Sequence, residues 1–572
     1  TASDFYRCVS DAVADSSDVM ASYRIFHKVL SQAVAQKVEF ERLKLPGLFA
    51  KINHLAQEYA LPDALLRSVN DVRIRLRRLF DNNNKQGCTR EQEKELHKYL
   101  LHDMKAICNF IEAVYAEPVP LSLRELYPRR ARKSVAVTRK SDCVRVMVNN
   151  WDEEYIYVVD DSSEPVERKV CYTDKNQYLQ GGDWTYIVPL LKERMQLNLV
   201  AVRIVDDAWM PELIILEPDV LVDVSSIAAC LEHYGDSPYT YLLNRLRPNE
   251  SSEPMILGNF ASLLLDNALL PEDKRRGYKD CAVEFFQRNA LQISTSELSD
   301  GFHAEAKRQF DNINSLLSGE GLAEVDALNQ SLAITEPSFF CEPLGLQGRM
   351  DFLQLDYSVL MEQKSGKGAF PPNPDPEVPN PQTKHYAQMI MYMAILHYNF
   401  GKKNANAYLL YSKYSKGLLG LGPAPLLLFR SIQMRNRIVW MEKEMAQTDL
   451  AERILRGITA ESLNVDKVRG VLWERYTKPQ IEGLLNPIKC ASQLEQAYFF
   501  RMLRFVMTEH LLGKIGSPSR DGSGFASKWH ETLEEKVMSG SIYCNLHIAS
   551  IDEDCSESVE VLELRADQAV SA

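Results

Sequence analysis

The stretch Gly348-Arg-Met-Asp-Phe-Leu-Gln-Leu-Asp-Tyr-Ser-Val-Leu-Met-Glu-Gln-Lys-Ser-Gly-Lys367 decides how the centre of this chain folds. Two short apolar runs flank the turn-forming residues Asp356-Tyr357-Ser358. Short apolar runs on either side of such a turn predict a β-hairpin, with strands over 348–355 and 359–364.

The second predicted strand carries an acid and a base on one face. Side chains two positions apart on a strand point the same way, so Glu362 and Lys364 are expected to lie together. Charged groups on an apolar strand are costly unless they have a task. If Asp351 on the neighbouring strand joins them, two carboxylates and an ammonium converge. Carboxylate oxygens suit Mg²⁺ or Mn²⁺, so the pattern predicts a metal-dependent catalytic site.

A helix expected over 382–398 supplies a polar stripe directly after the hairpin. His385, Gln388 and Tyr392 recur at helical spacing and therefore share one face. Apolar residues alternate with them and form the buried side. The stripe predicts supporting roles for these three residues in the site.

The chain has a formal net charge of -12, but its charge is unevenly distributed. Between Lys384 and Arg437 there are eight lysines and arginines and no aspartate or glutamate. Such a local patch is the expected footprint of phosphate contacts. The candidate nucleic-acid-binding residues are Lys384, Lys402, Lys403, Lys413, Lys416, Arg435 and Arg437. Tyr408, Tyr411 and Tyr414 lie among them, as base-stacking or as core residues.

At 572 residues the chain is too long for one core. We expect a multidomain α+β or α/β protein, with a helical domain over 1–130 and a β-barrel-like domain over 131–250. The hairpin and its helix fall in a domain over 251–445, followed by a helical segment and the start of a β-containing domain over 446–572. A barrel of oligonucleotide-binding (OB) type and a plain structural β-domain fit the second region equally.

These motifs resemble the RecB-like branch of the PD-(D/E)XK nucleases. The chain is most similar to the nuclease region of helicase–nucleases that trim Okazaki flaps. The matching pieces are Gly348-Arg-Met-Asp351, Glu362-Gln-Lys364-Ser-Gly366, His385-Tyr-Ala-Gln388 with Tyr392, and Ser431-Ile-Gln-Met-Arg-Asn-Arg437. The resemblance covers residues 250–445 and implies a restriction-endonuclease-like core.

The resemblance implies a role for each matching residue. Asp351, Glu362 and the backbone carbonyl of Gln363 would hold the metal, and Lys364 would be the catalytic lysine. Gln388 and Tyr392 would form the supporting motif. The implied activity is metal-dependent hydrolysis of DNA, single-stranded, flapped or at free ends, in replication or repair. The alternative is a decayed nuclease fold that binds or scaffolds DNA.

Two departures from the family pattern concern its upstream helix and its cysteines. Members commonly carry a histidine in a Gly-x-x-x-His-x-x-Leu-Glu pattern, and Ser262 stands at that place in this chain, with Asp266 at the acidic position. Some members hold an iron–sulfur cluster on four cysteines. The eleven cysteines here are widely spaced, so we expect neither such a cluster nor a disulfide framework.

The motor of a helicase–nuclease is not encoded in this sequence. No Gly-x-x-x-x-Gly-Lys-[Ser/Thr] motif occurs, so we expect no ATP site in this chain. A partner helicase would lie beyond residue 572 or on another chain. No apolar run approaches the length of a membrane span and no secretory signal is visible, so we expect a cytoplasmic protein, nucleoid-associated in a bacterium.

Overall fold

The structure is a computed structural model of the 572-residue chain. It describes residues 2–14, 18–38, 47–59, 61–80, 90–128, 140–160, 166–205, 207–248, 251–317, 328–402, 405–446, 448–516, 524–531, 533–538, 542, 546–552 and 561–566. Two compact units form, one of Thr1–Trp440 with Ile458–Pro487 and the other of Met441–Gly457 with Ile488–Ala572. Among the described residues, no helix is both long enough and apolar enough to span a membrane.

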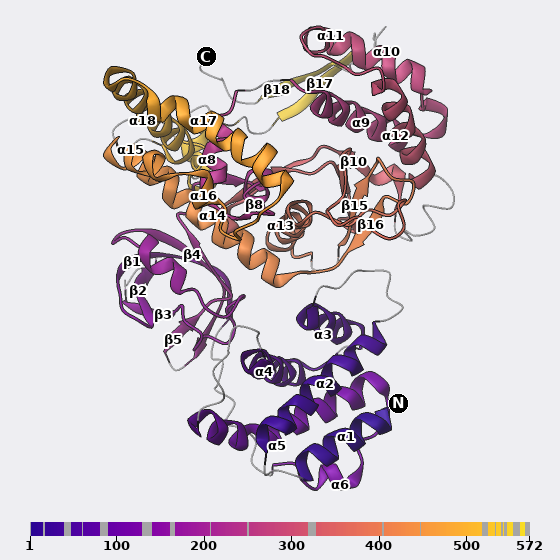
Figure 1. Cartoon of the computed structure of the whole chain (residues 1–572), viewed down its shortest axis with the longest axis vertical. Helices are drawn as coiled ribbons and strands as arrows, with labels where there is room; N and C mark the ends of the chain where they lie inside the picture. The colour runs from indigo at the N-terminus through magenta and orange to yellow at the C-terminus, as the bar shows by residue number, and fades with distance from the viewer. Residues whose placement is uncertain are drawn as a thin grey trace. The chain divides into compact units, whose positions relative to one another are not determined.

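Helices fill the N-terminal region, as the sequence predicts (Figure 1). These helices share one core, to which one helix contributes Phe26, Leu30 and Val34 and another contributes Val69, Val72 and Leu76. The helices are α1 (Ala2–Ala14), α2 (Val19–Lys37), α3 (Gly47–Glu58), α4 (Asp63–Phe80), α5 (Arg90–Tyr115) and α6 (Leu121–Arg124).

A small five-stranded barrel follows. Its strands pair in the order β1-β2-β3-β5-β4. Strand β4 also pairs with β1, which closes the barrel. Strand β6 forms an antiparallel pair with β4. The β3–β5 pair is parallel and the other pairs are antiparallel. The strands are β1 (Lys140–Trp151), β2 (Tyr155–Asp160), β3 (Arg168–Cys171), β4 (Gln196–Val205), β5 (Ala208–Met210) and β6 (Leu213–Leu216).

Short elements connect this barrel to the central region. They are β7 (Val222–Asp223), α7 (Val224–Ala228), β8 (Leu231–Glu232), β9 (Gly235–Asp236) and α8 (Pro238–Leu246). Helices α9 (Glu253–Leu269), α10 (Tyr278–Arg288), α11 (Ala290–Ser294) and α12 (Phe302–Leu317) come next.

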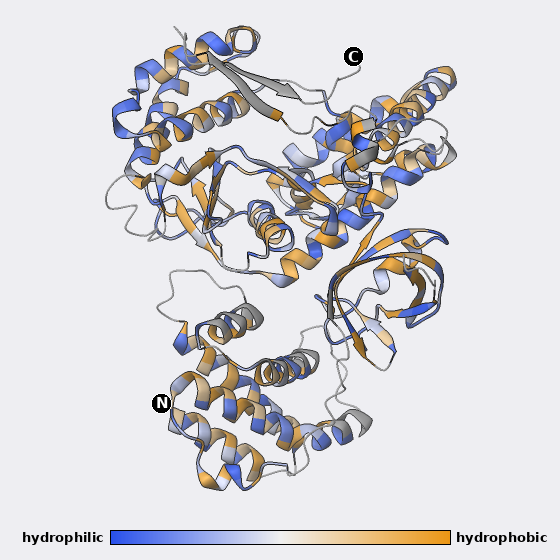
Figure 2. Ribbon diagram, turned by 180° about the vertical axis from the view of Figure 1, so that it is seen from behind, coloured by the Kyte–Doolittle hydropathy of each residue, from blue (hydrophilic) through white to orange (hydrophobic). Residues whose placement is uncertain are grey.

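The central region is built on a five-stranded mixed sheet in the order β10-β13-β14-β15-β16. Only the β14–β15 pair is parallel, and α13 (Thr383–Phe400) lies in the crossover between these two strands. Figure 2 shows that the strands of this sheet are mostly hydrophobic. The strands are β10 (Ala333–Thr335), β13 (Phe352–Gln354), β14 (Val359–Lys364), β15 (Asn406–Tyr411) and β16 (Leu418–Leu421), and α14 (Pro425–Met445) follows.

The predicted strand over 348–355 is wrong in one respect, because it is two strands in two sheets. β12 (Leu346–Arg349) pairs with β11 (Ser338–Cys341) and β7, whereas β13 pairs with β14 in the predicted hairpin. The break falls at Met350 and Asp351, where the chain leaves one sheet for the other. Asp351 therefore lies at a strand junction and not within a strand.

The second compact unit contains the end of α14 and a further set of helices. Within it, α15 (Thr448–Gly457) packs on α18 (Gln493–Ile515), and Lys514 pairs with the buried Glu442 at 3.1 Å. The β-structure expected within 446–572 is an antiparallel pair of β17 (Leu546–Asp552) and β18 (Val561–Ala566). Helices α19 (Ser527–His530) and α20 (Leu533–Met538) also belong to this unit, whereas α16 (Ala460–Leu463) and most of α17 (Lys478–Cys490) belong to the first.

Candidate active site

The side chains of β14 alternate between the hydrophobic core on one face and the candidate site on the other. Val359 and Met361 belong to the core that the sheet shares with α9 and α12. Glu362 and Lys364 have the opposite parity, so they point to the other face, where they meet α13. The predicted sharing of a face by these two residues is therefore confirmed by their direct contact.

Glu362, Lys364 and Gln388 form a closed hydrogen-bonded triangle. Nζ of Lys364 lies 2.7 Å from Oε1 of Glu362 and donates at 3.0 Å to Oε1 of Gln388. Nε2 of Gln388 donates to the same Glu362 oxygen at 2.5 Å. One amide thus holds an acid and a base at the same time, which fixes the orientation of both.

Asp351 reaches this group from the strand junction. Its Oδ2 accepts the backbone N–H of Gln363 at 2.7 Å, which places its carboxylate beside β14. Burial raises the pKa of Asp351, and the positive charge of Lys364 opposes that rise. Two carboxylates and an ammonium therefore share one partly enclosed site.

The surroundings of Glu362 are unfavourable for a charged carboxylate. Its side chain is almost fully buried, and its Oε2 has no hydrogen-bond partner among the described residues. Burial, opposed by Lys364, raises the pKa of Glu362 to about 7. A buried carboxylate oxygen without a partner costs on the order of 1–3 kcal/mol or more, and a cation bound there would remove this cost.

The residues fit Mg²⁺ or Mn²⁺ but supply few ligands. No cluster of three or more histidine, cysteine, aspartate or glutamate side chains suitable for a metal occurs in the described part of the chain. Mg²⁺ usually takes one or two carboxylates and completes its shell with waters and phosphate oxygens. Asp351, Glu362 and the carbonyl of Gln363 match that need.

Tyr392 anchors α13 against the strand junction. Its hydroxyl donates to the carbonyl of Arg349 at 2.6 Å and accepts from Gln388 at 3.2 Å. A Cβ on Gly348 would come 2.9 Å from Cε1 of Tyr392, closer than real contacts allow. The glycine of the Gly-Arg-Met-Asp motif is thus required for the tyrosine to approach.

His385 is a neutral structural neighbour of the triangle. Its Nδ1 lies 2.7 Å from the hydroxyl of Tyr411, which also accepts the backbone N–H of Gln382. Burial, together with Lys364 and Lys384, lowers the pKa of His385 to about 3. The pair fixes the first turn of α13, a role of Tyr411 that no sequence pattern indicated.

The two α9 candidates have different surroundings. The hydroxyl of Ser262 donates at 3.3 Å to the carbonyl of Gly258, one turn back on its own helix. The pKa of Asp266 is raised to about 6, first by burial and then by the negative charge of Glu336. The smaller influence of Asp351 in the same direction indicates that Asp266 borders the candidate site.

The predicted basic residues do not form one bare patch. Three of them form ion pairs with acidic residues from distant segments. The pairs are Lys384 with Glu232 at 3.7 Å, Lys413 with Glu305 at 3.0 Å and Lys416 with Asp375 at 2.9 Å.

Two other basic residues of this stretch pack over aromatic rings, Lys402 over Tyr357 and Arg437 over Tyr186. Lys403 lies outside the described residues.

Arg435 is unavailable to phosphate because it is fully buried. Its guanidinium donates to four backbone carbonyls, those of Leu216, Glu217, Val220 and Gly345. It joins the end of barrel strand β6 to the turn before β12. The nearby tyrosines are also structural, since Tyr411 is buried, Tyr408 packs in the core and Tyr414 accepts the N–H of Gly368.

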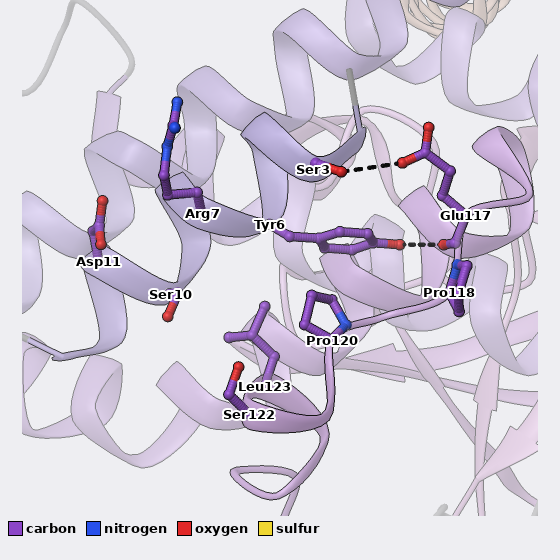
Figure 3. A pocket seen from close by; sticks show the side chains of 10 residues that line it. All are labelled: Ser3, Tyr6, Arg7, Ser10, Asp11, Glu117, Pro118, Pro120, Ser122 and Leu123. Carbon is purple, nitrogen blue, oxygen red and sulfur yellow. Dashed lines mark hydrogen bonds between the residues drawn. The ribbon is translucent and has the colours of Figure 1, made fainter.

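A pocket of about 450 Å³ lies between α1 and the segment that leads into α6 (Figure 3). Tyr6 and Ser3 close one side through hydrogen bonds to Glu117, while Arg7 and Asp11 lie at the other side. Its lining contains no histidine or cysteine. The lining carries two carboxylates, those of Asp11 and Glu117, but no lysine, so it does not repeat the lysine–carboxylate group of β14.

No protein-family model matches this chain, and no curated protein matches it either.

Proposed function

We propose that this chain is a metal-dependent nuclease of the PD-(D/E)XK class that hydrolyses DNA phosphodiester bonds. The observation that carries the proposal is the buried Oε2 of Glu362, which lacks a partner beside Asp351 and Lys364. An oxygen in that state, in a group of two carboxylates and one ammonium, is what a divalent cation would satisfy.

The proposed metal would be held by Asp351, Glu362 and the carbonyl of Gln363. When bound, such an ion polarises the phosphodiester and lowers the pKa of a water. The chain's own residues have separate tasks. Lys364 places a positive charge where negative charge develops on the phosphate oxygens. Gln388 holds that lysine in place, and Tyr392 holds Gln388.

The arrangement of the sheet supports the same proposal. Glu362 and Lys364 lie at the end of β14, within the parallel β14–β15 pair of the central sheet, and Gln388 of α13 contacts both. We include the nuclease fold in the proposal for this reason. The closed barrel of β1 to β5 suits an OB-type module, since five-stranded Greek-key barrels of that kind bind oligonucleotides.

The proposed substrate is single-stranded, flapped or end-containing DNA in replication or repair, with a helicase motor as partner. The test is cleavage of end-labelled single-stranded and flapped DNA with Mn²⁺, Mg²⁺ or EDTA. Wild type is compared with Glu362→Gln, and with Glu461→Gln as a surface control from the exposed ion pair with Lys478. We expect metal-dependent products in wild type and the control, and none in Glu362→Gln.

The same assay separates the alternative function. Ser262, whose hydroxyl bonds back to its own helix, supplies no imidazole at the family's histidine position, which favours a decayed site. If all three proteins bind DNA equally and none cuts it with either metal, the chain is a DNA-binding module and the catalytic roles above are wrong.

A further inference from the structure

The loop from Ser365 to Gln382 joins the candidate catalytic strand to α13. It begins directly after Lys364, ends directly before Thr383, and every residue of it is described. Both ends are therefore attached to elements that carry the site. The loop also bears Phe370, whose side chain is 92% exposed, the highest value among the described large hydrophobic residues.

Hydrogen bonds hold the two limbs of this loop together around Phe370. Asn380 contacts both neighbours of the phenylalanine, since its carbonyl accepts the N–H of Ala369 at 2.7 Å and its side chain donates to the carbonyl of Pro371 at 2.9 Å. The side chain of Asn373 donates to that of Asn380 at 3.2 Å. The backbone that presents the ring is thus tied on both sides.

The base of the loop is also held, by the turn between β15 and β16 and by a bond between its own ends. The N–H of Gly368 donates to the hydroxyl of Tyr414, and the amide of Gln382 donates to the carbonyl of Lys367. A Cβ on Gly368 would come 2.7 Å from the carbonyl oxygen of Asn380, so only glycine allows the limbs to close here. These contacts make the loop a rigid mount for an aromatic ring in solvent.

The position of Phe370 limits what the ring can meet. It lies six positions after Lys364, so it is within about 20 Å of the candidate site. Lys367 is exposed on the connecting limb and forms no ion pair with the described residues. A cation followed by an exposed aromatic ring suits a nucleic-acid strand, whose phosphate meets the cation while a base stacks on the ring.

From this geometry we infer that Phe370 is a base-stacking platform that positions single-stranded nucleic acid next to the site on β14. The inference rests on the proposed function and adds its positioning residue. Because the backbone beneath the ring is held in advance, binding has to order only the two side-chain torsions of Phe370, so stacking contributes directly to affinity. The ring touches no reacting group, so its loss weakens binding and KM more than kcat.

The test measures binding of the full chain to a fluorescent single-stranded oligonucleotide in EDTA, and cleavage of the same oligonucleotide in Mn²⁺. Phe370→Ala is expected to weaken binding about tenfold, the usual effect of one stacked base. Phe370→Trp is expected to bind as tightly as wild type. Phe370→Leu is expected to bind as weakly as Phe370→Ala, because leucine keeps the apolar surface without the π face. Leu291→Ala, at an 80% exposed position on α11, is the matched control and should bind as wild type does.

An abasic scan supplies the specific readout. Oligonucleotides that lack one base at successive positions should reveal one position where the loss weakens wild type, and the same loss should leave Phe370→Ala unaffected. Equal affinities of Phe370→Ala and wild type, in a protein that binds and cuts DNA, overturn the stacking role and leave the proposed function standing. A wild type that neither binds nor cuts overturns both.

Discussion

Lys364 and Glu362 lie two positions apart on β14 and are joined by an ion pair of 2.7 Å, of which the carboxylate is almost fully buried and the ammonium partly exposed. The pair leaves one carboxylate oxygen without a partner. An ion pair that served stability alone would satisfy both oxygens, because an unpaired buried oxygen is destabilising. The predictions below test what this arrangement is for.

Lys364→Met should slow cleavage at least about 100-fold while the fold is retained. The change removes the positive charge near the reacting phosphate, and loss of one such electrostatic group lowers rates by roughly 10²–10³-fold. Single-turnover cleavage in Mn²⁺ measures the effect, and circular dichroism checks the fold. A wild-type rate in this variant would refute the assignment of Lys364.

The pKa of Glu362 predicts a pH-dependent stability in the absence of metal. The folded value of about 7 lies above the ordinary 4.5, so between these pH values the folded chain keeps a proton that the unfolded chain releases. Stability from this group is present below pH 4.5 and is lost as the pH rises through 7. The loss is at most about 3 kcal/mol.

The difference in melting temperature between Glu362→Gln and wild type measures this effect in EDTA. The melting temperature of the variant should rise relative to that of wild type between pH 5 and pH 8, because glutamine does not ionise. Asp351 adds a slope of the same sign in both proteins, since its pKa is also raised. Mn²⁺ at pH 8 should restore wild type more than the variant, and a pH-independent difference would contradict the assigned pKa.

Arg435→Met should destabilise the fold by about 3–5 kcal/mol, because four buried carbonyls lose their donor. Arg437→Met is the control, since Arg437 packs over Tyr186 without such a network and should cost less. Thermal unfolding measures both. An unchanged melting temperature together with weaker DNA binding in Arg435→Met would contradict this structural role and support the phosphate contact that the sequence predicts for Arg435.

Gly348→Ala should reduce cleavage at least tenfold and cost about 1–3 kcal/mol of stability, because the buried Tyr392 and Val224 leave no room for a Cβ. The added Cβ would press against the ring of Tyr392 and shift the hydroxyl that supports Gln388. Gly483→Ala is the control, because nothing lies within 4 Å of its added carbon. Equal rates in Gly348→Ala and wild type would show that Tyr392 does not position the triangle.

Local sequence patterns were sufficient for the parts of the site that lie on single elements. The alternation along β14 predicts that Glu362 and Lys364 share a face, and helical spacing places Gln388 and Tyr392 on one side of α13. Both follow from fixed backbone periods, which operate over a few residues and need no knowledge of the remaining chain. The helical N-terminal region and the small barrel were predictable for the same reason.

The tertiary structure decided everything that depends on partners far away in the chain. Arg435 belongs by sequence to a basic stretch, yet it is buried because carbonyls about 90 and 220 positions earlier surround it. The lysines of that stretch meet acids from other segments, so local charge did not predict a surface patch. Residue spacing carries no information on such contacts, because only the folded chain brings their partners within a few ångströms.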